Sequence, residues 1–509
     1  MNSRIILILL IFNASFSFGQ TSLEEIALEN GAFSVGFRHY VTADSTRTYK
    51  RVYDWNNTTI PRPIPVSIWY PSTDHPKQSE ARTVLDYMQV LKEEEEWEYL
   101  PNEQILNWFY YPNTVENQQH LQEVTRAFTG IKPANGNFPV LVYAPSYQAS
   151  SIENFALCEY LASHGYIVIS SPSRGTENRF LEGGTEKDLE TQARDIEFLL
   201  AEITKFPNAN PNQIATMGFS FGGLSNVLAQ MRNEQIKAIV SLDGSIKYQL
   251  KTLKKSPFFN LENVDVPFIH FAQKNIPEEV LLADKIDPSL DHSFEFYDSL
   301  SNSQAYSLKF HNLSHSYFST LGVLFQPRDE RQDKSDLEIM ESYKLASVYT
   351  LKFLDAFLKD DQEALKFITN QPSDNGLKEK LVSYRSKQAD IQVFSFQDFN
   401  ELASTQKYQN LISLHESTLK EHPDLKLPEG NLNNLGLQLL YNSETAQNGI
   451  NIFLLATHLY PESANLFDSL GEAYLFIGEN EKAMENFEKS LHLYPENQNA
   501  IERLKQLQK

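Results

Sequence analysis

The feature that most constrains this chain is the motif Gly-x-Ser-x-Gly-Gly at residues 218–223, between an apolar strand-like run and a helix-like run. A turn tight enough to join such a strand to such a helix needs residues without side chains at Gly218 and Gly222. Gly223 lets the helix pack closely on the sheet, and Ser220 is expected at the strand tip with its hydroxyl exposed. The pattern predicts a nucleophile elbow; the alternative is a glycine-rich turn that carries an incidental serine.

Strand-like and helix-like segments alternate on both sides of this turn. The runs 138–145 and 166–170 are short, continuous and apolar, as in strands that are buried on both faces of a sheet. Further strand candidates are 36–41, 64–70, 237–242, 266–272 and 305–310, and helical spacing marks 155–162, 188–205 and 335–359. Alternating strands and helices form a mainly parallel sheet with crossover helices on both faces. The order of segments therefore predicts the α/β-hydrolase fold.

A serine hydroxyl needs a base to accept its proton and an acid to orient that base. In this fold the chain order is Ser, then Asp or Glu, then His, each at the carboxyl end of a strand. Of the histidines after Ser220, His270 lies inside an apolar strand and His292 lies among acids in a loop. His311 and His315 follow the last strand of the sheet. We expect His315 to be the base, because it stands just before a new segment, and His311 is the alternative.

The candidate acids lie between the elbow and these histidines. Asp243 ends the strand that follows the elbow helix, which is a suitable position for the orienting acid. Asp265 precedes its strand and would fall at the opposite edge of the sheet. Asp284, Asp287 and Asp291 follow the next strand and remain alternatives. The residues alone favour Asp243 without excluding these three.

Six segments in order along the chain give a more specific signal than the elbow alone. They are Pro-Val-Ser-Ile-Trp-Tyr-Pro at 65–71, Phe-Pro-Val-Leu-Val-Tyr-Ala-Pro-Ser-Tyr at 138–147, Leu-Ala-Ser-His-Gly-Tyr-Ile-Val at 161–168, Gly-Phe-Ser-Phe-Gly-Gly at 218–223, Leu-Asp at 242–243, and His315. Together they resemble the plasma type of platelet-activating-factor acetylhydrolase and its bacterial esterase relatives. The resemblance covers about residues 31–360. It implies a Ser-His-Asp esterase.

The resemblance also assigns individual residues. It implies that Asp243 is the acid and that the backbone N–H groups of Tyr147 and Phe221 stabilise the oxyanion. Two positions depart from the family pattern: Pro145-Ser146 replaces His-Gly, and Phe219 replaces a histidine. Proline has no N–H, but the donor lies one or two residues further on, so the oxyanion site can survive. These two departures do not argue against activity, but because of them the resemblance does not determine which esters the protein accepts.

The first 19 residues have the pattern of a cleaved secretory signal. Arg4 precedes the apolar run 5–12, and small residues follow up to Gln20. That run is short for a membrane span, and no later segment is long and apolar enough to form a transmembrane segment. The protein is therefore expected to be exported, to the periplasm or the extracellular space. Cys158 is the single cysteine, which excludes an intrachain disulfide.

The composition changes along the chain and suggests a division into domains. Residues 20–370 are expected to form the hydrolase domain, with an acidic and aromatic helical insertion at 80–130 that could cap a pocket. Residues 371–395 are rich in turn-forming residues at their start and are expected to be a linker. Residues 396–509 are expected to form a separate all-α module.

The all-α module repeats with a fixed period. Phe453, Ala456 and Pro461 recur 34 residues further on as Phe487, Ser490 and Pro495. This spacing, with Leu470-Gly471, Tyr474 and Ala483, resembles the tetratricopeptide repeat. The module is a candidate binding site for a protein partner. Because it has few repeats, its stability is expected to depend on contact with the hydrolase domain.

Charge and motif content narrow the possible functions. The net charge of −22, from 44 basic and 66 acidic residues, argues against nucleic acid as a partner. No dinucleotide, P-loop or zinc-type motif implies a cofactor or a metal. We therefore expect an exported serine esterase that acts on a small, short-acyl or acetyl ester. The alternatives are a carbohydrate acetyl esterase or serine peptidase on the same fold, and a catalytically dead scaffold that presents the repeats.

Overall fold

The computed structural model describes residues 21–283, 285–327, 332–378, 380–389, 394–440 and 442–507. The expected signal segment 1–19 and the alternative acid Asp284 lie outside the described residues.

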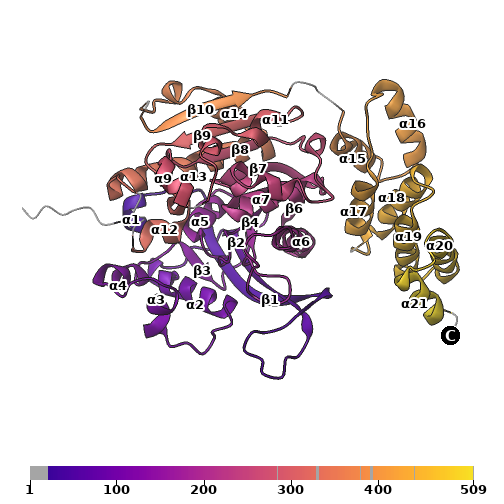
Figure 1. The fold of residues 1–509 in the computed structure, drawn as a ribbon, viewed down its shortest axis with the longest axis horizontal. Helices are drawn as coiled ribbons and strands as arrows, with labels where there is room; N and C mark the ends of the chain where they lie inside the picture. The colour runs from indigo at the N-terminus through magenta and orange to yellow at the C-terminus, as the bar shows by residue number, and fades with distance from the viewer. Residues whose placement is uncertain are drawn as a thin grey trace, which may run out of the picture.

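Within the described residues the strands form one ten-stranded sheet, in the order β10-β9-β8-β7-β6-β4-β5-β2-β1-β3 (Figure 1). Their bounds are β1 Ser34–Tyr49, β2 Ile60–Ser72, β3 Ala127–Thr129, β4 Phe138–Ala144, β5 Ile167–Ser170, β6 Ala209–Phe219, β7 Ile236–Leu242, β8 Phe268–Ala272, β9 Ala305–Phe310 and β10 Val382–Lys387. Strands β4 to β9 pair in parallel, whereas β1 with β2, β2 with β5, and β9 with β10 pair antiparallel. The prediction of a mainly parallel α/β-hydrolase sheet is therefore confirmed.

The central strands are apolar on both faces because helices cover both. Helices α5 (Phe155–Ser163) and α13 (Asp336–Leu358) share one core with the side chains on one face. Helices α6 (Glu186–Ile203) and α7 (Phe221–Met231) share a second core with the other face. Each residue of β4 is buried, which explains its unbroken apolar sequence.

Shorter helices connect these layers. Those before the C-terminal module are α1 Leu23–Ile26, α2 Val84–Glu94, α3 Ile105–Trp108, α4 Val115–Leu121, α8 Leu250–Leu253, α9 Glu278–Ala283, α10 Ser289–His292, α11 Glu295–Ser299, α12 Thr320–Leu324 and α14 Gln362–Thr369. Helices α2, α3 and α4 lie in the segment 80–130, which was expected to be helical. The same segment also contains β3, which pairs with β1.

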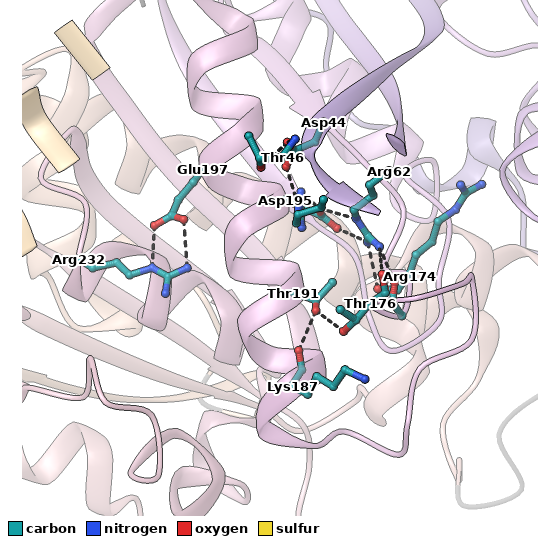
Figure 2. A network of polar contacts seen from close by, with 12 residues as sticks. Asp44, Thr46, Arg62, Arg174, Thr176, Lys187, Thr191, Asp195, Glu197 and Arg232 are labelled. Atoms are coloured by element: carbon teal, nitrogen blue, oxygen red, sulfur yellow. Dashed lines mark hydrogen bonds and ion pairs between the residues drawn. The ribbon is translucent and has the colours of Figure 1, made fainter. Parts of the chain in front are cut away.

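A buried ion-pair network fastens the antiparallel arm β1–β2 to helix α6 (Figure 2). Asp195 of α6 accepts hydrogen bonds from Arg62 of β2 at 2.7 Å and from Arg47 of β1 at 2.6 Å. Arg47 also pairs with Asp44 at 2.6 Å. Because these groups are almost fully buried, removing one partner would leave an unpaired charge, which costs about 3–5 kcal/mol. The network fixes the arm against the layer that carries the elbow helix.

Strand β10 lies within 371–395, where the sequence predicts only a linker. It pairs with β9 from Val382, opposite Phe310, to Lys387, opposite Ala305. Its mostly polar sequence Val-Ser-Tyr-Arg-Ser-Lys has no apolar run, because an edge strand is covered on one side only. The sheet therefore extends to residue 387, and the boundary of the first domain has to be moved beyond residue 370.

The chain beyond β10 is all-helical, as predicted. Its helices are α15 Phe396–Thr405, α16 Leu411–Glu421, α17 Glu429–Leu440, α18 Ala446–Leu459, α19 Ala464–Phe476, α20 Asn480–Leu493 and α21 Gln498–Leu507. Figure 1 shows them as a group beside the sheet. Gly436 packs against the ring of Phe453, and Gly471 packs in the same way against Phe487. Two successive helix pairs thus use the same glycine–phenylalanine contact.

Candidate active site

The elbow places Ser220 between β6 and α7 in a strained backbone conformation. Its φ of 53° and ψ of −119° lie where residues other than glycine are rare. A Cβ at Gly218 would lie 2.4 Å from the backbone of Gly222, and one at Gly222 would lie 2.1 Å from the carbonyl oxygen of Ala144. A Cβ at Gly223 would lie 2.6 Å from the Cα of the facing glycine on the next strand connection. These contacts are the steric reason for the three glycines.

Three side chains meet at the carboxyl ends of neighbouring parallel strands. Ser220 follows β6, Asp243 follows β7, and His315 begins a short helix after β9. The Nε2 atom of His315 lies 3.0 Å from the Oγ atom of Ser220. Its Nδ1 atom lies 2.5 Å from the Oδ2 atom of Asp243. The structure thus brings together the three residues that the sequence analysis put forward.

The surroundings of Asp243 favour its ionised form. The side chain is buried, which by itself would raise its pKa, but the hydrogen bond and the electrostatic interaction with His315 outweigh burial and lower the pKa below its usual value. Gln273 adds hydrogen bonds from its backbone N–H at 3.0 Å and its side-chain amide at 2.8 Å. An ionised carboxylate only accepts, so Nδ1 of His315 carries the proton. Nε2 of the neutral ring is then free to accept the hydroxyl proton of Ser220.

The two residues that are expected to supply the oxyanion donors, Phe221 and Tyr147, contact each other. Phe221 is the first residue of α7, where a backbone N–H has no partner within the helix. Tyr147 lies in the loop after β4; the preceding N–H, that of Ser146, donates to the Oε2 atom of Glu153 at 2.9 Å. The rings of Tyr147 and Phe221 contact each other edge to face at 5.9 Å. The side chain of Tyr147 therefore lies beside the residue that follows Ser220.

Two buried glutamates hold the loop that carries Tyr147, and sequence reasoning missed both. Glu153 accepts from the hydroxyl of Ser146 at 2.6 Å as well as from its N–H. Glu94, at the end of α2, accepts from the N–H of Ser151 at 3.0 Å and from the hydroxyls of Ser150 and Ser151. Burial raises the pKa of each carboxyl, against the effect of these hydrogen bonds. The insertion thereby helps to shape the loop that carries Tyr147.

The alternative residues have other partners. His311 pairs through Nε2 with Ser383 at 2.7 Å, and His270 is buried in β8, with Nδ1 2.9 Å from the hydroxyl of Ser241. His292 is the last residue of α10, and Asp291 forms an ion pair with Lys247. The side chain of Asp287 accepts a hydrogen bond from the backbone N–H of Ser289. Asp265 precedes β8, at the amino end of the sheet.

The described residues contain no group of three or more His, Cys, Asp or Glu side chains arranged to hold a metal ion.

Across the part of the chain that the structure describes, no helix has both the length and the apolar character needed to cross a membrane.

The chain is similar to a known protein family over part of its length and to solved structures. The family model described as X-Pro dipeptidyl-peptidase (S15 family) matches residues 127–252, which include the elbow and Asp243. A ferulic acid esterase from Streptomyces cinnamoneus is 17% identical over 70% of this chain and 98% of its own, with a TM-score of 0.49. A search among curated proteins found no match. The parallel sheet, the elbow and the family match together identify the chain as a serine hydrolase with the α/β-hydrolase fold.

Proposed function

We propose that this chain is an exported esterase that hydrolyses short-acyl carboxylic esters through Ser220, His315 and Asp243. The observation that carries the proposal is the continuous hydrogen-bonded relay from Ser220 Oγ to His315 Nε2, at 3.0 Å, and from His315 Nδ1 to Asp243 Oδ2, at 2.5 Å. The resemblance to plasma-type platelet-activating-factor acetylhydrolase supports an acetyl or similarly short acyl group.

The geometry supports a two-step acyl transfer. Ser220 Oγ attacks the ester carbonyl while His315 Nε2 accepts the hydroxyl proton, and the N–H groups of Tyr147 and Phe221 stabilise the oxyanion. His315 then gives the proton to the departing alcohol, which leaves an acyl-serine. A water molecule attacks the acyl-serine, with His315 again accepting a proton, and releases the carboxylic acid. Asp243 keeps the imidazole in the required tautomer and stabilises it when it is protonated.

A serine peptidase is the second candidate, because the family match over 127–252 is to dipeptidyl-peptidases that act next to proline. The same residues could form an acyl-enzyme from a peptide bond. The two candidates differ in the leaving group, which is an alcohol for an esterase and an amine for a peptidase. A comparison of substrates therefore separates them.

The test combines active-site labelling with a substrate panel. We expect a fluorophosphonate probe to label the wild-type protein and not Ser220→Ala. The panel contains p-nitrophenyl acetate, butyrate and octanoate, together with glycyl-prolyl-p-nitroanilide. Faster turnover of the acetate or butyrate supports the esterase, and faster turnover of the anilide supports the peptidase. Absence of both labelling and turnover in folded protein would support the dead scaffold.

Export and the repeat family are further parts of the proposal. The signal-like sequence at 1–19 supports export to the periplasm or beyond, and detection of a mature chain that begins near Gln20 would test it. The 34-residue period and the repeated contacts of Gly436 with Phe453 and Gly471 with Phe487 support a tetratricopeptide-like module.

A further inference from the structure

A pocket separate from the catalytic residues lies on one face of the sheet at the β8–β9–β10 edge. It has a volume of about 430 Å³, within the usual range for a small-molecule site. Ser220, Asp243 and His315 are not among its lining residues. We call it the sheet-edge pocket and define it by Lys247, His270, Asp291, Ser307, Lys309 and Arg385.

The floor of the sheet-edge pocket is polar where such a sheet is usually apolar. His270 of β8 pairs in register with Ser307 of β9, which pairs in turn with Arg385 of β10. In the next row, Lys309 pairs with Ser383. Most alternate residues of the same strands, on the opposite face, are aliphatic or aromatic and pack in the core shared with α13. One row of polar side chains thus crosses all three strands on this face, and the next row is polar on β9 and β10, with Ala272 on β8.

The lining carries an excess of positive charge. Lys247, Lys309 and Arg385 are cationic, and Asp291 is the one lining carboxylate in the described part of the chain. Arg385 also pairs with the exposed Asp298, outside the lining, at 3.5 Å. Lys247 is buried. Its Nζ atom lies 2.9 Å from the backbone carbonyl oxygen of Asp291 and 3.5 Å from the Oδ1 atom of the same residue. Lys309 donates to the neutral side chain of Asn275 at 2.6 Å. The chain as a whole carries a net charge of −22, so a local cluster of positive side chains stands out against it. Such a cluster favours the binding of an anionic ligand.

Two buried polar atoms of the lining have no hydrogen-bond partner among the described residues: Nε2 of His270 and Oδ2 of Asp291. Both side chains are at least 96% buried, being 0% and 4% exposed. Burial lowers the pKa of His270 to about 3, so the ring is neutral. When the Ser241 hydroxyl donates to Nδ1, the ring carries its proton on Nε2 and offers a donor. Buried polar groups are nearly always satisfied, so these two atoms call for a partner.

We propose that the sheet-edge pocket binds a small anion that also carries a hydroxyl group, separately from the ester bound at Ser220. Lys309 and Arg385 hold the carboxylate or phosphate at the more exposed side. The Nε2–H group of His270 donates from the floor, and Oδ2 of Asp291 accepts from the ligand hydroxyl. Hydroxycarboxylates and phosphorylated sugars share this chemistry.

The experiment measures binding to full-length Ser220→Ala, so that its outcome does not depend on hydrolysis. Isothermal titration calorimetry is run with citrate, glucose 6-phosphate, inorganic phosphate and glucose at concentrations up to about 20 mM. We expect saturable binding of citrate, glucose 6-phosphate or both, and much weaker binding of inorganic phosphate, which cannot span the pocket. Binding of only one of the two identifies the anionic group. Equal binding of neutral glucose would overturn the proposal, as would no saturable binding of any anion.

Matched variants locate the site. In the same Ser220→Ala background, Lys309→Gln with Arg385→Gln should weaken binding at least about tenfold, because each removes a charged contact. Both side chains are partly exposed, so the double variant should fold, which its melting temperature checks. Lys387→Gln is the control, since Lys387 lies two residues beyond Arg385 on β10 and does not line the pocket. Equal affinities of the double variant and the control would show that the anion binds elsewhere and would overturn the assignment.

Discussion

The side-chain amide of Asn434 donates a hydrogen bond to the backbone carbonyl of Arg232, 2.7 Å away, at the end of the elbow helix α7. The same helix begins beside Ser220, so the helical module is fastened to the end that points away from the catalytic residues. Ion pairs of Lys237 with Glu401 and of Lys426 with Glu262 lie at the same amino-terminal side of the sheet. The module therefore has no contact by which it could form part of the proposed active site within the described residues.

The first prediction concerns removal of the module. A chain that ends at residue 389 keeps β10 and should hydrolyse p-nitrophenyl acetate within about threefold of the full chain, per folded molecule. A chain that ends at residue 370 loses β10 and leaves β9 as an unpaired edge. It should melt at a lower temperature and aggregate more readily. Loss of activity in a folded chain that ends at 389 would show that the module completes the site.

The second prediction concerns the acid. Asp243→Asn should lower kcat on the order of 10³–10⁴-fold, because an amide leaves His315 in the wrong tautomer. Asp291→Asn is the matched comparison and should cost less than about tenfold, since Asp291 contacts Lys247 and not the imidazole. Steady-state kinetics on p-nitrophenyl acetate measure both. A larger loss from Asp291→Asn at equal stability would move the acid to the loop after β8.

The third prediction concerns Glu94, the residue of the insertion 80–130 that accepts hydrogen bonds from the loop that carries Tyr147. Glu94→Ala removes the acceptor for Ser150 and Ser151 and should lower kcat about 10–100-fold, with a smaller change in KM. The neighbouring Glu93→Ala is the control, because Glu93 is exposed. If both variants keep wild-type kcat, the loop is held without Glu94.

The fourth prediction concerns pH and the docking of the module. Burial and the nearby charge of Asp398 raise the pKa of Asp265 to about 6, and burial also raises the pKa of Glu234, which accepts from Asn431 of the module. A carboxyl with a raised pKa binds its proton more tightly in the folded state, so its stabilising effect is present at low pH and is lost as the pH rises through about 6. Lys237 opposes the shift.

Differential scanning calorimetry between about pH 4.5 and 7 checks this prediction. The melting temperature of the wild-type module should fall over that range relative to that of Asp265→Asn, which cannot ionise. Parallel curves for the two proteins would show that Asp265 does not titrate at the interface.

Most strands of the central sheet could be predicted from the sequence, and Ser220, Asp243 and His315 could be named as candidates. Each of these features is marked by a pattern of neighbouring residues. A continuous apolar strand, a glycine elbow and a residue at a strand end can each be recognised without knowing the fold. Strand β10 left no such signal, since an edge strand with Ser383 and Arg385 on its open face resembles a loop in composition. The acceptors Glu94 and Glu153 were missed for another reason. Their partners are set by how the insertion and the β4 loop pack, which no local pattern records.

The close approach of Gly218, Gly222 and Ala144 has a consequence for how this protein can change by mutation. A methyl group at Gly218 meets the backbone of Gly222, and one at Gly222 meets the carbonyl of Ala144 on β4. Neither clash can be relieved by shortening a side chain, because the nearest atoms in both cases belong to the backbone. A compensating change would have to displace β4, and with it the loop that carries Tyr147. A single substitution at Gly218 or Gly222 is therefore not tolerated by itself. Such a substitution can become fixed only together with a change in β4 or in the loop that follows it.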